Sequence, residues 1–237
     1  MLASFFQTWY HDAGTVPEDW HSAVVRAAAA NKLTYRKCGR TGKYKPPRSH
    51  YDPVTGRLVL NMDHFCPWVA NTVGYHNRKF FILFTAWGCL ACAWASLTLI
   101  PFALRFTHAE KLDARGEAMR SFAVMAAALD GTFAVCLLCF SLGHLYMAAS
   151  NTTSLEGGRE AFHFDLGWRR NLEQVFGRDR RLWLLPVYGS GPVGDGVVWT
   201  LRDGSMFGLP DQDFQQPPPP PQPPAAQRGE DADECKV

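Results

Sequence analysis

The sequence has little net charge, no signal-peptide pattern in its first ten residues and no set of cysteines spaced as in a disulfide framework. Its 24 lysines and arginines nearly balance 22 aspartates and glutamates, which argues against a nucleic-acid-binding protein. The first ten residues, MLASFFQTWY, lack the basic start and the cleavage site of a signal peptide. Four of the seven cysteines lie in apolar runs, where cysteine behaves as a small hydrophobic residue. We therefore expect the polar segments to face a reducing compartment.

Two apolar runs are long enough to cross a membrane. Residues 80–102 carry no charged side chain, and residues 122–149 carry one, Asp130, together with His144. Each run reaches the roughly 20 residues that a membrane-spanning helix needs. An acidic side chain inside a membrane is costly unless it faces protein or water, which counts against the second run. Two buried helices of a soluble domain are the alternative interpretation.

Basic residues gather on one side of these runs. Nine of the ten charged residues from Arg26 to Arg57 are basic, and six arginines lie between residues 159 and 181. The segment between the runs instead balances three basic against three acidic residues from residue 107 to residue 120. Positive residues favour the cytosolic side of a membrane. We therefore expect both basic flanks to be cytosolic and residues 103–121 to form a lumenal loop.

The remaining segments carry weaker signals. Residues 1–33 form an N-terminal segment with a short predicted helix at 21–33, and the glycine-rich stretch 186–212 is typical of a hairpin within a C-terminal region, residues 150–212. Residues 213–237 are rich in proline and predict a disordered tail. This tail is either a spacer or a ligand for SH3, WW or similar domains.

The tetrapeptide from Asp63 to Cys66 contains the groups of a thiol active centre. A cysteine nucleophile needs its thiolate, which an imidazole can generate and a carboxylate can support. Neighbouring side chains point apart on a strand or helix, so we expect a turn at Pro67 to bring Asp63, His64 and Cys66 together. Cys66 lies fourteen residues before Phe80, near the predicted membrane surface. A long-chain acyl-CoA, with a polar thioester and a lipid tail, fits that position. An ordinary loop is the alternative.

Longer motifs surround this tetrapeptide. The segment from Lys45 to Phe81 reads KPPRSHYDPVTGRLVLNMDHFCPWVANTVGYHNRKFF and resembles the DHHC protein S-acyltransferase (palmitoyltransferase) family, here with DHFC. DAGTVP at residues 12–17 resembles the family's DPG motif, and TSLE at residues 153–156 resembles its TTxE motif, with Ser154 replacing the second threonine. FDLGWRRNLEQVFG resembles the C-terminal aromatic motif, with Asn171 on its characteristic asparagine. The four motifs occur in family order.

The resemblance implies an α-helical polytopic membrane protein. Two transmembrane helices, at 80–102 and 122–149, follow a small irregular cytosolic DHHC-like catalytic domain at residues 34–79. The family usually has four spans, two of them before the DPG motif, and this chain begins about a dozen residues before that motif. We therefore expect this chain to contain only the last two spans.

The chain departs from the family at its metal ligands. Members typically bind two structural zinc ions through Cys3His sets, and Cys38 falls on the first ligand position. The other ligand positions are occupied by Thr41, Tyr51, Asp52, Thr55, Leu58, Phe65 and Thr72. A tetrahedral zinc site needs four ligands, usually cysteine or histidine. We therefore expect no metal and no other cofactor, with packing and hydrogen bonds in place of zinc.

The resemblance also implies a two-step transfer of a long-chain acyl group, palmitoyl above all. Cys66 takes the acyl group from acyl-CoA as a thioester and passes it to a cysteine of a protein, with His64 as base and Asp63 orienting it. Lys45 and Arg48 either contact the CoA phosphates or form a plain basic surface. Expected partners are acyl-CoA, cysteine-containing proteins and membrane lipid, in the Golgi, endoplasmic reticulum or plasma membrane. A catalytically inactive, truncated relative that acts as a membrane-bound interaction protein, and a thiol hydrolase, are the alternatives.

Overall fold

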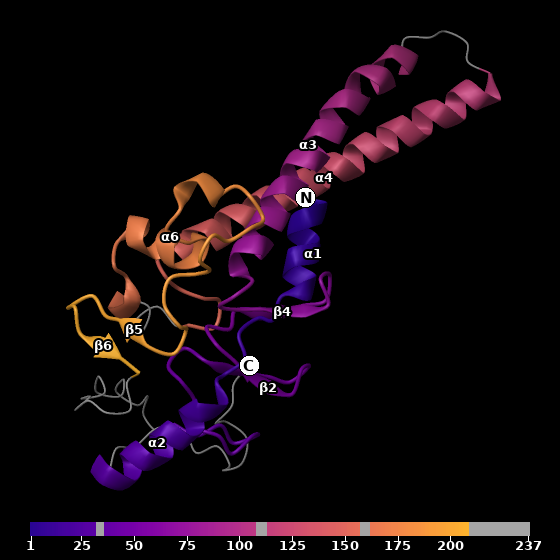
Figure 1. Ribbon diagram of the computed structural model, residues 1–237. Helices are drawn as coiled ribbons and strands as arrows, with labels where there is room; N and C mark the ends of the chain where they lie inside the picture. The colour runs from indigo at the N-terminus through magenta and orange to yellow at the C-terminus, as the bar shows by residue number, and fades with distance from the viewer. Residues whose placement is uncertain (32–35, 108–112, 157–161, 209–237) are drawn as a thin grey trace, which may run out of the picture.

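Two long helices project together from a group of shorter elements (Figure 1). The computed structural model describes residues 1–31, 36–107, 113–156 and 162–208. The long helices are α3 (Arg78–Thr107) and α4 (Ala114–Ala149), and both are long and apolar enough to cross a membrane. The prediction of two long apolar helices is therefore confirmed.

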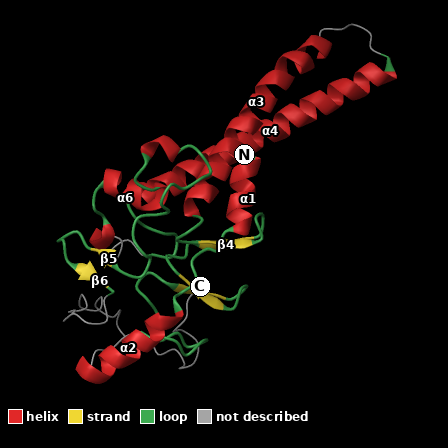
Figure 2. Cartoon of the chain, viewed as in Figure 1, coloured by secondary structure: helices red, strands yellow, loops and turns green. Residues whose placement is uncertain are grey.

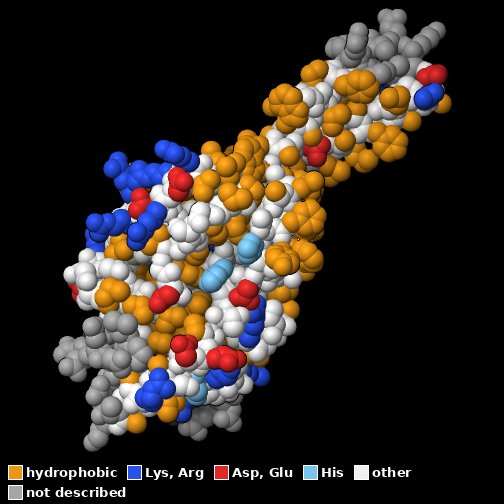
Figure 3. All heavy atoms as spheres, in the orientation of Figure 1, with side chains coloured by type: hydrophobic (Ala, Val, Ile, Leu, Met, Phe, Trp, Pro, Cys, Tyr) orange, Lys and Arg blue, Asp and Glu red, His pale blue; other side chains and the backbone are white. Residues whose placement is uncertain are grey.

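The surface of the helix pair is apolar (Figure 3). Trp94 of α3 is 72% exposed and Phe122 of α4 is 65% exposed, and many other large apolar side chains of both helices are exposed as well. Buried helices of a soluble domain would cover such residues, whereas a lipid environment accommodates them. The membrane interpretation is therefore favoured over the soluble one.

The helix ends differ from the predicted ones. α3 begins at Arg78 instead of residue 80 and continues through Pro101 to Thr107. α4 begins at Ala114 instead of residue 122, because the Asp113 carboxylate accepts a hydrogen bond from the Gly116 backbone N–H at 2.8 Å and caps the first turn. The predicted loop at 103–121 is correspondingly shorter, and its residues 108–112 lie outside the described residues. Hydropathy marks the lipid-compatible stretch and not the ends of the helix.

The N-terminal segment holds two helices, α1 (Leu2–Tyr10) and α2 (Glu18–Asn31). The sequence predicted a helix near α2 but none at α1, and the absence of α1 from that prediction is an error. α1 packs against α3 and the strand β4 (Asn71–Val73). The Asn71 side-chain amide donates hydrogen bonds to the carbonyls of Thr8 and His11 at 3.0 and 2.8 Å, which satisfies the end of α1. A prediction from neighbouring residues does not include these contacts, because they join positions about 60 residues apart.

The domain before α3 is built from short antiparallel hairpins (Figure 2). Strand β1 (His50–Asp52) pairs with β2 (Arg57–Val59), and β3 (His64–Cys66) pairs with β4 (Asn71–Val73). A third hairpin, β5 (Trp199–Thr200) with β6 (Met206–Phe207), lies within the stretch where a hairpin was predicted.

The C-terminal region packs back onto the ends of the long helices. It contains the turns η1 (Phe162–Phe164) and η2 (Arg180–Leu182) on either side of α6 (Trp168–Phe176). The Asn171 amide donates to the Ala149 carbonyl at 2.7 Å, which ties α6 to the end of α4.

The start of α3 is fastened to the same region. The fully buried Lys79 ammonium donates to the Leu182 and Val187 carbonyls at 2.8 and 2.5 Å. The proline-rich tail from residue 213 lies outside the described residues.

Candidate active site

Strand β3 brings His64 and Cys66 to one face. Successive side chains of a strand point to opposite faces, so His64 and Cys66 share a face while Phe65 points to the other. From the sequence, a turn at Pro67 was expected to bring these side chains together. The turn is present, since the Ala70 N–H donates to the Pro67 carbonyl at 3.2 Å, but it connects β3 to β4. The alternation of β3 itself places the His64 imidazole beside the thiol.

Asp63 lies just before β3 and is fully buried. Its Oδ2 is 2.7 Å from His64 Nδ1, and its Oδ1 accepts the Ser154 backbone N–H at 2.8 Å. The Ser154 hydroxyl donates to the Asp63 backbone carbonyl at 2.7 Å. The serine that replaces the second threonine of the TTxE-like motif therefore makes a hydrogen bond through its hydroxyl. Burial opposes the negative charge, but the His64 hydrogen bond and the nearby Arg78 hold the pKa of Asp63 well below its usual range. Asp63 is therefore a carboxylate directed at His64.

His64 and Cys66 form a pair in which each supports the charge of the other. Burial disfavours the imidazolium, but hydrogen bonds with Asp63 and Cys66 raise the pKa of His64 to about 9. Burial also disfavours the thiolate, yet hydrogen bonds from His64 and from the backbone N–H groups of Val69 and Trp68 lower the pKa of Cys66. The geometry therefore favours a thiolate beside an imidazolium, which is the reactive form of a cysteine nucleophile.

Apolar residues of the β3–β4 hairpin and of the start of α3 surround the thiol. Cys66 is buried in a cluster with Val69, Val73 and Phe81, against which Phe84 packs. A thioester bound here would have its carbonyl at Cys66 and its hydrocarbon chain beside the helix pair. This arrangement suits a substrate with a polar reactive group and an apolar tail.

A second imidazole lies at the same carboxylate. His144 of α4 is 4% exposed, and its Nδ1 is 3.7 Å from Asp63 Oδ2. The ring centroids of His144 and His64 are 5.6 Å apart. His144 lies within an apolar run and was not among the site residues predicted from the sequence. A polar side chain in an otherwise apolar span was the available signal.

The spacing of these three groups differs from that of zinc ligands. The ligand atoms of Asp63, His64 and His144 lie within 4.8 Å of one another. Two ligands of one tetrahedral zinc ion are about 3.3 Å apart, since each lies about 2.0 Å from the metal. Asp63 and His64 approach to 2.7 Å, which is a direct hydrogen bond. Asp63 and His64 are therefore arranged as a hydrogen-bonded pair and not as two ligands of one zinc ion.

Arg48, a candidate CoA contact, is used inside the protein. Its guanidinium donates to both carboxylate oxygens of Glu156, at 2.5 and 2.7 Å, and to the Asn151 side chain and carbonyl at 2.8 and 2.7 Å. The group lies over the rings of Phe164 and Trp199. These contacts favour a structural role for Arg48.

Lys45 is half-buried, and its backbone N–H donates to the Arg36 carbonyl at 2.8 Å. This hydrogen bond engages only the backbone of Lys45, so its side-chain ammonium stays a candidate contact for a CoA phosphate.

Three positions on which the family has metal ligands meet in a hydrogen-bonded cluster. Asp52 Oδ2 accepts from the hydroxyls of Thr55, at 2.7 Å, and Thr72, and Oδ1 accepts the Val54 N–H at 2.9 Å. Asp52 and Thr72 are fully buried. A carboxylate and two threonine hydroxyls do not supply the cysteine and histidine ligands of a structural zinc ion. The residues present at these positions therefore do not fit zinc.

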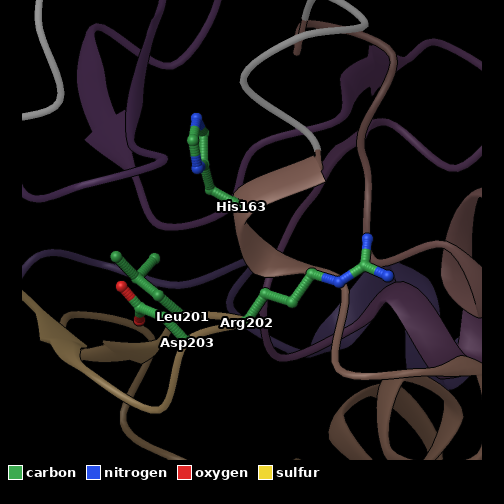
Figure 4. A pocket seen from close by; sticks show the side chains of 4 residues that line it. All are labelled: His163, Leu201, Arg202 and Asp203. Atoms are coloured by element: carbon green, nitrogen blue, oxygen red, sulfur yellow. The ribbon is translucent and has the colours of Figure 1, made fainter.

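A surface pocket elsewhere does not resemble an active site. It is lined by His163 of η1 together with Leu201, Arg202 and Asp203. The side chains of His163 and Arg202 point in different directions (Figure 4), so the polar groups do not converge on a common ligand position.

Comparison with known proteins agrees with the motifs. The DHHC palmitoyltransferase family model matches residues 31–160. The probable protein S-acyltransferase 12 of Arabidopsis thaliana is 34% identical over 208 residues, which cover 81% of this chain and 71% of the relative. Palmitoyltransferase ZDHHC15 of Xenopus laevis is 37% identical over 175 residues, 70% of this chain and 50% of the relative. Palmitoyltransferase ZDHHC2 of Mus musculus is 34% identical over 83% of this chain and 55% of the relative. The chain belongs to the DHHC palmitoyltransferase family.

Proposed function

We propose that this protein is a membrane-bound protein-cysteine S-acyltransferase that moves a long-chain acyl group, palmitoyl above all, from acyl-CoA to cysteines of other proteins. Its family membership supports the activity. The observation that carries the proposal is the arrangement around β3. There Cys66 and His64 share a face, Asp63 holds His64, and the first turns of α3 lie beside the thiol.

In the first step, the Cys66 thiolate attacks the carbonyl carbon of the acyl-CoA thioester. The bond from that carbon to the CoA sulfur breaks, and the His64 proton goes to the CoA thiolate. The products are acyl-Cys66, neutral His64 and CoA.

In the second step, His64 takes the proton of a protein cysteine, and that sulfur attacks the acyl carbon. Cys66 leaves as a thiolate beside protonated His64, so the starting pair is restored. Each step exchanges one thioester for another.

Asp63 has a supporting role in both steps. Its hydrogen bond to His64 Nδ1 selects the tautomer in which the other ring nitrogen faces Cys66, and its charge stabilises the imidazolium. Lys45 is proposed to contact CoA phosphate. The acyl chain is proposed to lie along the helix pair, where each buried methylene contributes about 0.8 kcal/mol.

The protein is proposed to work without zinc. The hydrogen bonds from Thr55 and Thr72 to Asp52 join the β1–β2 turn to β4, which supports a metal-free domain. Elemental analysis of the purified protein should find far less than one zinc ion per chain, and a chelator should leave thermal stability unchanged. Thr72→Val should lower stability, because it leaves Asp52 with one hydroxyl partner fewer. A stoichiometric zinc ion whose removal unfolds the protein would contradict this proposal.

The two apolar helices and the family make this a membrane protein. A multi-pass arrangement is proposed in which β1 to β4 and α6 are cytosolic and the α3–α4 connection is lumenal, because the flanks are basic. The proposed compartments are the Golgi, the endoplasmic reticulum and the plasma membrane. The proline-rich tail is proposed as a ligand for SH3 or WW domains.

The direct test is acyl labelling of Cys66 in membranes. With an alkyne analogue of palmitate, the wild type should carry a hydroxylamine-labile label that is absent in Cys66→Ser. Cys139→Ser is the matched control, since Cys139 is an exposed thiol of α4. A label that persists in Cys66→Ser would refute the assignment.

Transfer of that label to a cysteine peptide separates the alternatives. Release of free fatty acid without transfer would indicate a thiol hydrolase. No label in any variant would indicate a non-catalytic relative.

A further inference from the structure

His144 carries a buried polar atom that has no hydrogen bond. Its side chain projects from α4, and Nδ1 is shielded from solvent and lacks a partner. The rings of Phe81 and Phe140 pack on the imidazole with centroids at 5.0 and 4.5 Å, which keeps water away from it. Buried polar atoms are nearly always hydrogen bonded, so an exception needs an explanation.

The atom faces the carboxylate that holds the catalytic base. Asp63 Oδ2 lies 2.7 Å from His64 Nδ1 and 3.7 Å from His144 Nδ1, so two imidazoles approach one oxygen. The other oxygen, Oδ1, is occupied by the Ser154 N–H. From α3, Arg78 places a positive charge near the group, and Cys66 lies on the far side of His64. A shift of about 0.8 Å would convert the 3.7 Å contact into a normal hydrogen bond.

The reaction creates a need for that bond. Under the proposed function, on which this inference rests, the His64 proton leaves with CoA once Cys66 is acylated. The buried Asp63 carboxylate then faces a neutral His64. We propose that His144 is a positioning residue that donates its Nδ1–H to Asp63 in the acyl-enzyme, so that His64 stays neutral and ready to accept the proton of the protein cysteine.

Loss of this donor has a specific consequence. Without His144, no second imidazole shares Asp63 Oδ2 with His64, so the Asp63 charge holds a proton on His64 up to a higher pH. The transfer step, which needs neutral His64, should then move to a higher pH. A charge-assisted hydrogen bond is strong enough to shift the midpoint by about one pH unit, which slows transfer about tenfold below it.

The test measures transfer from isolated acyl-enzyme to a cysteine peptide, from about pH 6 to about pH 10, a range that covers histidine and thiol titration. His144→Phe keeps an aromatic ring and removes the donor, whereas His144→Gln retains an N–H. Ser141→Ala is the matched control, because Ser141 is a buried polar residue one turn earlier on α4. The peptide thiol titrates identically in every sample, so differences in midpoint belong to the enzyme.

We expect the wild type, Ser141→Ala and His144→Gln to share a midpoint and His144→Phe to have a midpoint about one unit higher. An unchanged midpoint in His144→Phe, or an equal shift in Ser141→Ala, would overturn the inference. A wild type that forms no acyl-Cys66 would refute the proposed function instead.

A measurement on the wild type covers the case in which His144→Phe does not fold. Nitrogen NMR of labelled histidines should show a new hydrogen bond at His144 Nδ1 when the acyl-enzyme forms. A spectrum of His144 identical in the resting and acylated enzyme would overturn the inference.

Discussion

Replacing Glu156 by glutamine should destabilise the protein by about 3–5 kcal/mol, the typical cost of breaking a buried ion pair. The side chains of Arg48 and Glu156 are only 2% and 6% exposed, so the variant leaves a guanidinium buried without an anion. Glu156 also accepts the Thr153 N–H at 3.0 Å, which stabilises the loop that contains Ser154. The backbone N–H of Ser154 in turn donates to Asp63. Loss of stability should therefore be accompanied by slower acylation.

The assay is thermal unfolding in detergent, where this loss corresponds to a fall in Tm of about 6–20 °C. The double variant Arg48→Met/Glu156→Met should recover most of the stability, because no charge remains buried. Glu173→Gln is the matched control, since its partner Arg180 is 61% exposed and such pairs contribute about 0–1 kcal/mol. The reasoning is refuted if Glu156→Gln costs no more than this control, or if the double variant is less stable than Glu156→Gln.

Three further predictions concern the site and its support. The Cys66 thiolate should persist above its lowered pKa and be lost as the pH falls through that pKa. In alkylation kinetics measured against pH, His64→Gln should move the midpoint of the Cys66 titration up toward the ordinary thiol value of about 8.5. An unchanged midpoint would contradict the pairing of His64 with Cys66. Ser154→Ala should lower the free energy of unfolding by about 1 kcal/mol and slow acyl-enzyme formation, whereas Ser154→Thr should retain both stability and rate. Equal behaviour of the two variants would show that the hydroxyl hydrogen bond does not support the site. Gly74→Ala should lower Tm, because a Cβ there would lie 2.6 Å from the backbone oxygen of Ala13. An unchanged Tm would show that the backbone at Ala13 can shift at little cost.

The sequence analysis recovered the features that depend on neighbouring residues. Length and apolar content are properties of a single segment, and for that reason α3 and α4 were predicted as helices, although α4 begins at Ala114 and not at residue 122. The tetrapeptide from Asp63 to Cys66 was found because its chemistry is contained in four positions. The reason for its convergence was assigned to Pro67, although the two-residue repeat of β3 accounts for the shared face of base and thiol.

The contacts that complete the site join distant parts of the chain. Arg48 and Glu156 are 108 positions apart, and Ser154 and Asp63 are 91 apart. A resemblance could name the motifs that contain them but could not show that they touch. Arg48 is the clearest case. The sequence left open whether it contacts CoA or forms part of a basic surface, and its hydrogen bonds to Glu156 favour a structural role instead.

By itself, the sequence determined that two apolar helices follow a polar segment with a thiol, an imidazole and a carboxylate, because hydropathy and side-chain chemistry are local. Tertiary structure alone decided that two imidazoles approach Asp63 and that Thr55 and Thr72 both donate hydrogen bonds to Asp52. Side-chain contacts between separate elements depend on how hairpins and helices pack. That packing is set by the whole chain, and no short pattern encodes it.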